Sequence, residues 1–206
     1  MKKLLILVFS VTLLQAVQTP DEAFQRLKQG NHRFATEKLL HPDRTQERRL
    51  SLTDGQSPYA VIVTCSDSRV IPEIIFDEGL GDLFVIRVAG NIVGSTELES
   101  VIYAVDHLNP SIIVVMGHES CGAVNAVVQN HDQDIPAIAQ LIQPSVEKAR
   151  DMKGSDLLKK SVELNAMNMR SLLMNVKTIG EKVHAESLAV HGAYYNLQTG
   201  VVDFLD

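Results

Sequence analysis

Two short segments of the chain place thiols and polar side chains directly after apolar runs. Residues 59–64 are mostly apolar and β-branched, and they lead into the sequence C-S-D-S-R at 65–69. Residues 111–116 form a second apolar run, which leads into G-H-E-S-C-G at 117–122. Apolar runs without polar alternation are typical of strands buried on both faces of a parallel sheet. Because open α/β sheets bind ligands at the carboxyl ends of their strands, both segments are predicted to contribute to one site.

Cys65, His118 and Cys121 have the residue types of a metal site. His118 and Cys121 are three residues apart, so a turn or a first helical turn would direct both side chains to one place. Two parallel strands would present Cys65 at the same edge of the sheet. Three protein ligands with an open fourth position are typical of catalytic zinc sites, whereas structural sites are closed by four. The sequence therefore predicts one catalytic Zn²⁺ ion per chain.

Asp67 and Arg69 follow Cys65 at intervals of two residues. Asp67 can reach the fourth position, where it would either accept a hydrogen bond from bound water or bind the metal and close the site. Arg69 is placed to hold the Asp67 carboxylate through a charge-assisted hydrogen bond, which keeps the carboxylate ionised. The alternative interpretation of this pair is an ordinary surface ion pair.

The two cysteines also allow a reading without a metal. In an exported protein, Cys65 and Cys121 could form a disulfide, and the chain would then be a non-enzymatic α/β binding protein. A structural disulfide gives no reason for Asp67, Arg69 and His118 to gather beside it. Metal ligation is therefore the favoured interpretation.

The C-S-D-S-R segment at 65–69, followed by G-H-x-x-C-G at 117–122, resembles the β-class carbonic anhydrases, and the resemblance extends over about residues 24–205. It implies three zinc ligands, which are Cys65, His118 and Cys121. It also implies a pair that orients the water or hydroxide at the zinc, which is Asp67 and Arg69. The implied reaction is the reversible hydration of CO₂ to bicarbonate and a proton. A hydrolase of CS₂ or COS on the same scaffold is the enzymatic alternative.

The resemblance extends to a substrate pocket and to an assembly. Gln56 matches a glutamine that binds the substrate oxygen in plant-type members, and Gly122 resembles the glycine whose backbone N–H serves the same pocket. Phe84 resembles an aromatic residue that lines the cleft and is reached across the dimer interface. A homodimer or tetramer is therefore implied, with the amino-terminal helices wrapping the partner subunit.

One position departs from a subgroup of this family. The bicarbonate-regulated members carry a tryptophan three residues before the first cysteine ligand, whereas this chain has Ile62 there and contains no tryptophan. Val70 and Arg87 match the regulatory pocket of that subgroup, but packing or ion pairing would also account for them. An open site with water as the fourth ligand is therefore expected near neutral pH, and closure by Asp67 at lower pH is the alternative.

Residues 1–16 have the layout of a secretory signal peptide. Lysines at positions 2 and 3 precede an apolar run at 4–14, which is too short to span a bilayer comfortably. We therefore expect a periplasmic or secreted protein, with cleavage after Ala16 and a single domain over 20–206. The alternative is a first helix of a cytoplasmic protein. No cysteine follows the apolar run, so a lipoprotein anchor is not indicated. No stable membrane anchor of another kind is expected either.

The overall composition excludes some partner classes. The 206 residues are 45% hydrophobic with a formal net charge of −6, which fits one globular domain with a sizeable core. Basic residues are not concentrated in any segment, so a nucleic-acid partner is not expected.

The order of the predicted elements defines a fold class. Strands are expected at 59–64, 83–88, 111–116, 187–195 and 201–205, with helices between the first four. This order predicts an α/β fold in which a mainly parallel central sheet is flanked by helices, with an antiparallel C-terminal edge strand and an N-terminal helical arm. The sequence also predicts three details of the helices. The first helix is expected to be interrupted at Gly30-Asn31, and the helical segment over 135–151 is expected to break near Pro144. One long helix is expected over 155–178.

Overall fold

The computed structural model describes residues 18–152, 154 and 156–205. The predicted signal peptide, residues 1–16, lies outside this part of the chain. None of the described helices is long and apolar enough to cross a membrane.

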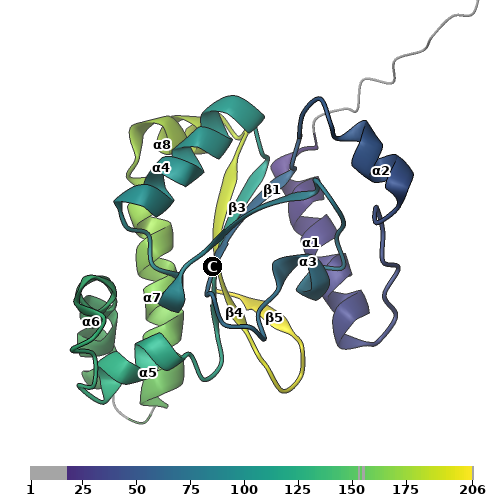
Figure 1. Cartoon of the computed structure of the whole chain (residues 1–206). Coiled ribbons are helices and arrows are strands. Elements are labelled where there is room, and N and C mark those ends of the chain that lie inside the picture. Colours follow the sequence, from purple (N-terminus) through teal and green to yellow (C-terminus); the bar gives the residue numbers. More distant parts are fainter. Residues whose placement is uncertain (1–17, 153, 155, 206) are drawn as a thin grey trace, which may run out of the picture.

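The centre of the protein is a five-stranded sheet in the order β2-β1-β3-β4-β5 (Figure 1). The strands are β1 (Ala60–Thr64), β2 (Leu83–Arg87), β3 (Ile112–His118), β4 (Ala189–Tyr195) and β5 (Val202–Phe204). The first four run parallel to one another, and β5 pairs antiparallel with β4 at one edge. The predicted α/β fold with an antiparallel C-terminal strand is confirmed.

Helices lie on both sides of this sheet. Figure 1 shows α1, α2 and α3 on one side and α4 to α8 on the other. The helices are α1 (Pro20–Ala35), α2 (Gln46–Ser51), α3 (Pro72–Ile75), α4 (Ser95–Tyr103), α5 (Gly122–Val128), α6 (Pro136–Arg150), α7 (Leu157–Met174) and α8 (Lys177–His184). Two single turns complete the described elements, η1 (Ala89–Asn91) after β2 and η2 (Ala104–Leu108) after α4.

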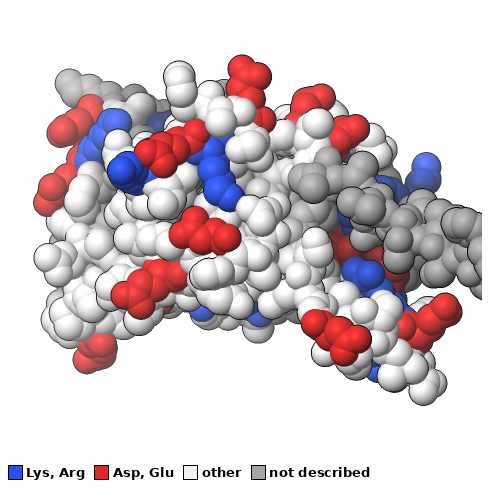
Figure 2. Space-filling model, turned by 90° about the horizontal axis from the view of Figure 1, so that it is seen from above, with Lys and Arg blue, Asp and Glu red and all other residues white. Residues whose placement is uncertain are grey.

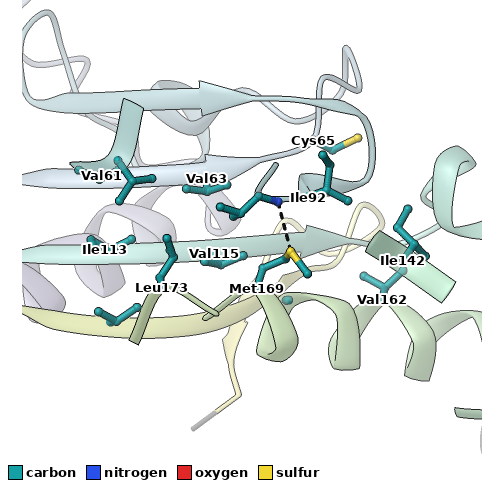
Figure 3. Close-up of a cluster of buried hydrophobic side chains, with 14 of the residues drawn as sticks. Val61, Val63, Cys65, Ile92, Ile113, Val115, Ile142, Val162, Met169 and Leu173 are labelled. Atoms are coloured by element: carbon teal, nitrogen blue, oxygen red, sulfur yellow. Dashed lines mark hydrogen bonds between the residues drawn. The ribbon is translucent and has the colours of Figure 1, made fainter. Parts of the chain in front are cut away.

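The two faces of β1 and β3 pack into two hydrophobic clusters. On one face the strands pack against α7, and the cluster there includes Val61, Val63, Ile113, Val115, Met169 and Leu173 (Figure 3). The other face packs against α1, and its members include Ile62, Val114, Ala23 and Leu27. Because successive side chains of a strand point to opposite faces, a strand covered on both sides is apolar throughout. This explains the two unalternating runs of the sequence.

Helix α1 begins with a capping box. The Thr19 hydroxyl accepts the Glu22 N–H, and the Glu22 carboxylate accepts the Thr19 N–H. The buried Ala23 and Leu27 face the sheet, so the N-terminal helix is part of the domain core.

The predicted interruption of α1 at Gly30-Asn31 is wrong, because the helix continues to Ala35. A Cβ at Gly30 would lie 1.8 Å from the Phe76 carbonyl oxygen, so glycine allows the helix to approach the backbone after α3. The Asn31 amide donates to the Ile75 and Gly200 carbonyl oxygens. Both residues therefore dock the helix and do not end it.

The predicted break near Pro144 is also wrong, since α6 runs through it. A proline inside a helix removes one backbone hydrogen bond and costs about 3 kcal/mol. The flanking Ile142, Ser145 and Val146 are fully buried, so packing of this helix face offsets the cost.

The single helix expected over 155–178 is divided in the structure. Helix α7 ends at Met174, where Asn175 forms the C-cap, and α8 begins at Lys177. The Asn175 amide donates to the Ser171 carbonyl oxygen in the last turn. This local bond competes with helix continuation, as asparagine commonly does.

Charged side chains of both signs are scattered over the face shown in Figure 2. Basic side chains do not gather into a continuous patch among the described residues visible there.

Candidate metal centre

The structure brings Cys65, His118 and Cys121 together at the carboxyl edge of the sheet. Cys65 follows β1, His118 is the last residue of β3, and Cys121 is the N-cap of α5. One ligand atom from each lies within 4.8 Å of the others, and all three residues are buried. Ligand atoms about 2.0–2.3 Å from a tetrahedral zinc ion lie roughly 3.3–3.8 Å apart, so the three atoms are close enough to reach one ion after small side-chain movements.

The His118 ring is oriented by the backbone. Its Nδ1 lies 2.8 Å from the Glu119 carbonyl oxygen, and since a carbonyl only accepts, Nδ1 carries the proton and donates. The Nε2 lone pair is therefore free, yet this buried atom has no hydrogen-bond partner among the described residues. Metal-binding histidines usually donate from the second ring nitrogen in this way. The ring is thus prepared to bind a metal through Nε2.

Glu119 fixes the carbonyl that orients His118, and the sequence analysis did not single it out. Its N–H donates to the Tyr195 carbonyl oxygen at 2.8 Å. Its carboxylate accepts the N–H groups of Leu197 and Gln198 at 3.0 and 3.3 Å. The turn after β3 is therefore tied to the turn after β4, which accounts for an acidic residue between His118 and Cys121.

Cys65 and Cys121 interact through a hydrogen bond that shifts their pKa values in opposite directions. The Cys121 thiol donates to Cys65, which lowers the pKa of Cys65 to about 4 and raises the pKa of Cys121 well above its ordinary value. The Gly90 N–H also donates to the Cys65 sulfur at 3.3 Å. Both cysteines are free, so the disulfide alternative is not supported. A dication would supply the positive charge that two adjacent thiolates need.

Asp67 and Arg69 form the predicted bidentate pair. The Arg69 Nε and one terminal nitrogen donate to the two Asp67 carboxylate oxygens at 2.9 and 2.7 Å, and the Arg69 N–H donates at 2.9 Å. The Arg69 guanidinium holds the pKa of the Asp67 carboxyl well below its ordinary range. Asp67 Oδ2 also lies 3.9 Å from His118 Nε2. An ionised carboxylate is therefore placed beside the Cys65, His118 and Cys121 cluster.

Arg87 braces the turn that carries Cys65 and Asp67. Its guanidinium donates to the Cys65 carbonyl oxygen at 3.2 Å and to the Asp67 carbonyl oxygen at 2.7 Å. The sequence left the role of Arg87 open, because a lone arginine in a strand does not reveal carbonyl partners in the loop after a different strand. The structure places it in the supporting shell of the centre.

The three predicted substrate residues differ in their placement. Gly122 is the first residue of α5, next to Cys121, and no atom lies within 4 Å of where its Cβ would stand. Phe84 lies on β2 in register with Val61, half-buried, with its ring 6.3 Å from the Tyr103 ring. Gln56 precedes the amino end of β1 and lines a hollow of about 450 Å³ there. Within one chain, Gln56 is therefore separated from Cys65 by the length of β1.

The structure is an α/β fold in which a Cys-His-Cys group that could bind a metal ion lies at the carboxyl ends of parallel strands. A profile of the carbonic anhydrase family matches residues 60–202. Carbonic anhydrase 2 of Mycobacterium tuberculosis is 40% identical over 191 residues, covering 88% of this chain and 90% of that protein. A carbonic anhydrase of Pseudomonas aeruginosa is 36% identical over 180 residues, covering 81% of each chain.

Solved structures agree with these relatives. The β-carbonic anhydrase CcaA matches with a TM-score of 0.70 and 28% identity, covering 89% of this chain and 95% of that chain. One of two tetrameric β-carbonic anhydrases from Sordaria macrospora matches with a TM-score of 0.67 and 26% identity, covering 88% and 96%. The chain belongs to the β-class carbonic anhydrases. It is an enzyme of reversible CO₂ hydration, which yields bicarbonate and a proton.

Proposed function

We propose that this carbonic anhydrase depends on Zn²⁺ held by Cys65, His118 and Cys121. The observation that carries the proposal is the His118 ring, whose Nδ1 donates to a backbone carbonyl while its buried Nε2 has no partner among the described residues. Two sulfurs and one imidazole are ligands that Zn²⁺ prefers, and they leave a fourth position open. When bound, Zn²⁺ supplies a Lewis acid that lowers the pKa of water to about 7.

Asp67 is proposed to orient the water or hydroxide that adds to CO₂. An ionised carboxylate only accepts hydrogen bonds, so it aligns an O–H group and leaves an oxygen lone pair for the carbon atom. Arg69 holds both carboxylate oxygens and thereby fixes the acceptor beside His118. The roles assigned to this pair by resemblance are supported by its geometry.

The fourth position is proposed to remain open to solvent near neutral pH. To bind the metal through Oδ2, the oxygen nearest His118, Asp67 would have to weaken the bidentate pair with Arg69 that fixes this oxygen. Charge-assisted bidentate bonds are among the stronger hydrogen bonds of proteins, so this exchange is unfavourable while the pair is intact. Ile62, which stands where the bicarbonate-regulated members have tryptophan, agrees with an open site.

The substrate pocket is proposed to be completed by a second copy of the chain. Gly122 would offer its N–H beside Cys121, while Gln56 and Phe84 would come from the partner subunit. Gln56 cannot line the pocket of its own chain, because β1 separates it from Cys65. The edge strand β2 offers four half-buried apolar residues, Leu83, Phe84, Val85 and Ile86, and unpaired strand edges are common sites of association. A homodimer or a tetramer built from it fits, and the Sordaria macrospora relatives are tetrameric.

The protein is further proposed to act outside the inner membrane, in the periplasm or beyond. The charge and apolar layout of residues 1–16 supports export. Mass spectrometry of the mature protein tests this proposal, because a chain that begins after Ala16 is expected. A cytoplasmic protein with residues 1–16 intact would contradict it.

Metal analysis and a crystal structure of the zinc-loaded protein test the centre. One Zn²⁺ per chain is expected, bound by Cys65, His118 and Cys121, with Asp67 still paired to Arg69 at pH 8. Asp67 bound to the metal at that pH would contradict the open site. A disulfide between the cysteines in freshly purified protein would contradict the zinc site itself.

A further inference from the structure

The backbone that contacts Cys65 has an unusual conformation. Gly90 and Asn91 are consecutive residues with φ angles of 73° and 46°, both in the left-handed region. A Cβ at Gly90 would lie 2.7 Å from Ile142 Cδ1, so a side chain there would also require the end of Ile142 to shift. This turn directs the Gly90 N–H to the Cys65 sulfur. Such a conformation persists when surrounding contacts hold it in place.

Asn165 of α7 supplies one such contact. Its amide nitrogen donates to the Gly90 carbonyl oxygen at 2.8 Å, across a sequence separation of 75 residues. Helix α7 also reaches the same segment through Met169, whose sulfur accepts the Val93 N–H at 3.1 Å (Figure 3). Val162 and Met169 lie on the same face of α7 as Asn165, and all three are buried. Helix α7 therefore holds the 90–93 segment, which contacts Cys65, through two hydrogen bonds.

Burial makes the amide of Asn165 costly. The residue is fully buried, and its Oδ1 has no hydrogen-bond partner among the described residues. Buried polar atoms without partners are unfavourable, and an apolar side chain of similar shape would avoid the cost. The bond from the amide to Gly90 is the interaction that offsets part of it.

We propose that Asn165 is a positioning residue of the metal centre, acting on Cys65 through Gly90. By holding the Gly90 carbonyl, it fixes the direction of the N–H that donates to the Cys65 sulfur. That hydrogen bond orients the sulfur and withdraws electron density from it, so it adjusts how strongly the thiolate donates to a bound metal. The inference rests on the proposed zinc site.

The test compares Asn165→Leu with Asn168→Leu in the full chain. Asn168 lies one turn further along α7, and its amide donates to the Ser145 hydroxyl at 2.8 Å, away from the centre. The two readouts are the Zn²⁺ dissociation constant from chelator competition and the sulfur-to-metal absorption band of the Co²⁺-substituted protein. Asn165→Leu is expected to weaken Zn²⁺ binding about 10-fold and to shift the sulfur-to-metal absorption band. A loss of about 10-fold is the lower end of the losses in metal affinity seen when residues that support metal ligands are replaced. Asn168→Leu is expected to leave both readouts at their wild-type values.

Two results would overturn the role of Asn165. One is an Asn165→Leu variant with wild-type affinity and spectrum, and the other is the same change in Asn168→Leu. If circular dichroism shows that Asn165→Leu is unfolded, Asn165→Ala is compared with Asn168→Ala by the same criteria. A wild-type protein that binds neither Zn²⁺ nor Co²⁺ would instead overturn the proposed zinc site.

Discussion

At the scale of single residues, Asp67 and Arg69 contribute in different ways. An unperturbed aspartate has a pKa of about 3.9, so Asp67 would be ionised at neutral pH even without Arg69. The low pKa that Arg69 produces is therefore a sign of close contact and is not needed to maintain the charge. Arg69 acts chiefly on geometry, since its planar fork holds both carboxylate oxygens.

Substitution of this pair should separate geometry from charge. Asp67→Asn replaces the acceptor-only carboxylate with a group that can also donate, and kcat/KM for CO₂ hydration should fall about 100-fold or more. Arg69→Lys keeps the positive charge but loses the fork, so a loss of about 10-fold is expected. Stopped-flow hydration measures both, with zinc content unchanged. Undiminished hydration in Arg69→Lys beside a large loss in Asp67→Asn would indicate that charge alone matters and would contradict the role of the fork.

Asp77 gives a prediction for the pH dependence of stability. Burial alone would raise the pKa of this carboxyl, but the Leu40 N–H, the Arg33 guanidinium and the His41 N–H outweigh burial and lower it. A lowered folded-state pKa stabilises the fold above the unfolded-state pKa, about 3.9, and this contribution disappears as pH falls through the folded-state value.

Asp77→Asn should therefore lower the free energy of unfolding by about 2 kcal/mol at pH 7, with a deficit that shrinks below about pH 4. Urea unfolding at pH 7 and at successively lower pH measures it. Asparagine tolerates the left-handed backbone at this position, where φ is 49°. A deficit that is constant with pH would show that the ionised carboxylate is not the source.

At the scale of elements, the packing of a helix against the rest of the fold determines whether it continues through a residue of low helix propensity. Gly30 and Pro144 are both unfavourable in helix interiors, yet α1 and α6 run through them. Gly30 permits contact with the Phe76 backbone, and Pro144 is flanked by buried residues. Neither contact is visible in a local sequence window, because its partner lies in another part of the chain.

Gly30→Ala should destabilise the protein although alanine favours helices. The gain in helix propensity is about 1 kcal/mol, but a Cβ 1.8 Å from the Phe76 carbonyl oxygen requires α1 to move away from its docking site. A net loss of about 2 kcal/mol or more in the free energy of unfolding is expected. Gly55→Ala is the control, since no atom lies within 4 Å of its Cβ position. A stabilised Gly30→Ala variant would contradict this account of the α1 docking.

The strands and the clustering of Cys65, His118 and Cys121 could be predicted from the sequence because both depend on local patterns. Unalternating apolar runs identified β1 and β3, and the ligands follow those runs directly. The supporting contacts could not be predicted, since Gly90 reaches Cys65 and Asn165 reaches Gly90 across 25 and 75 residues. Glu119 was missed for the same reason, because its partners lie in the turn after β4.

At the scale of the whole molecule, the proposed substrate role of Gln56 requires a second chain to complete the site. A mixture of Gln56→Ala and Cys121→Ser chains tests this. Each variant alone is expected to be poorly active. In a mixed dimer, the Gln56→Ala chain keeps its metal ligands and receives Gln56 from its partner. Random mixing should therefore restore about a quarter of the wild-type activity per chain. No recovery after verified subunit exchange would contradict a shared pocket.

The most direct test of the central claim is stopped-flow CO₂ hydration with a pH indicator, on zinc-quantified wild-type and Cys121→Ser protein. We expect one Zn²⁺ per chain in the wild type, with hydration that increases as pH rises through about 7, and loss of both in Cys121→Ser. Full zinc content with negligible hydration between about pH 6.5 and 9 would contradict the account, and sulfide release from CS₂ or COS would then identify the hydrolase. Undiminished hydration in Cys121→Ser would contradict the assigned ligand set.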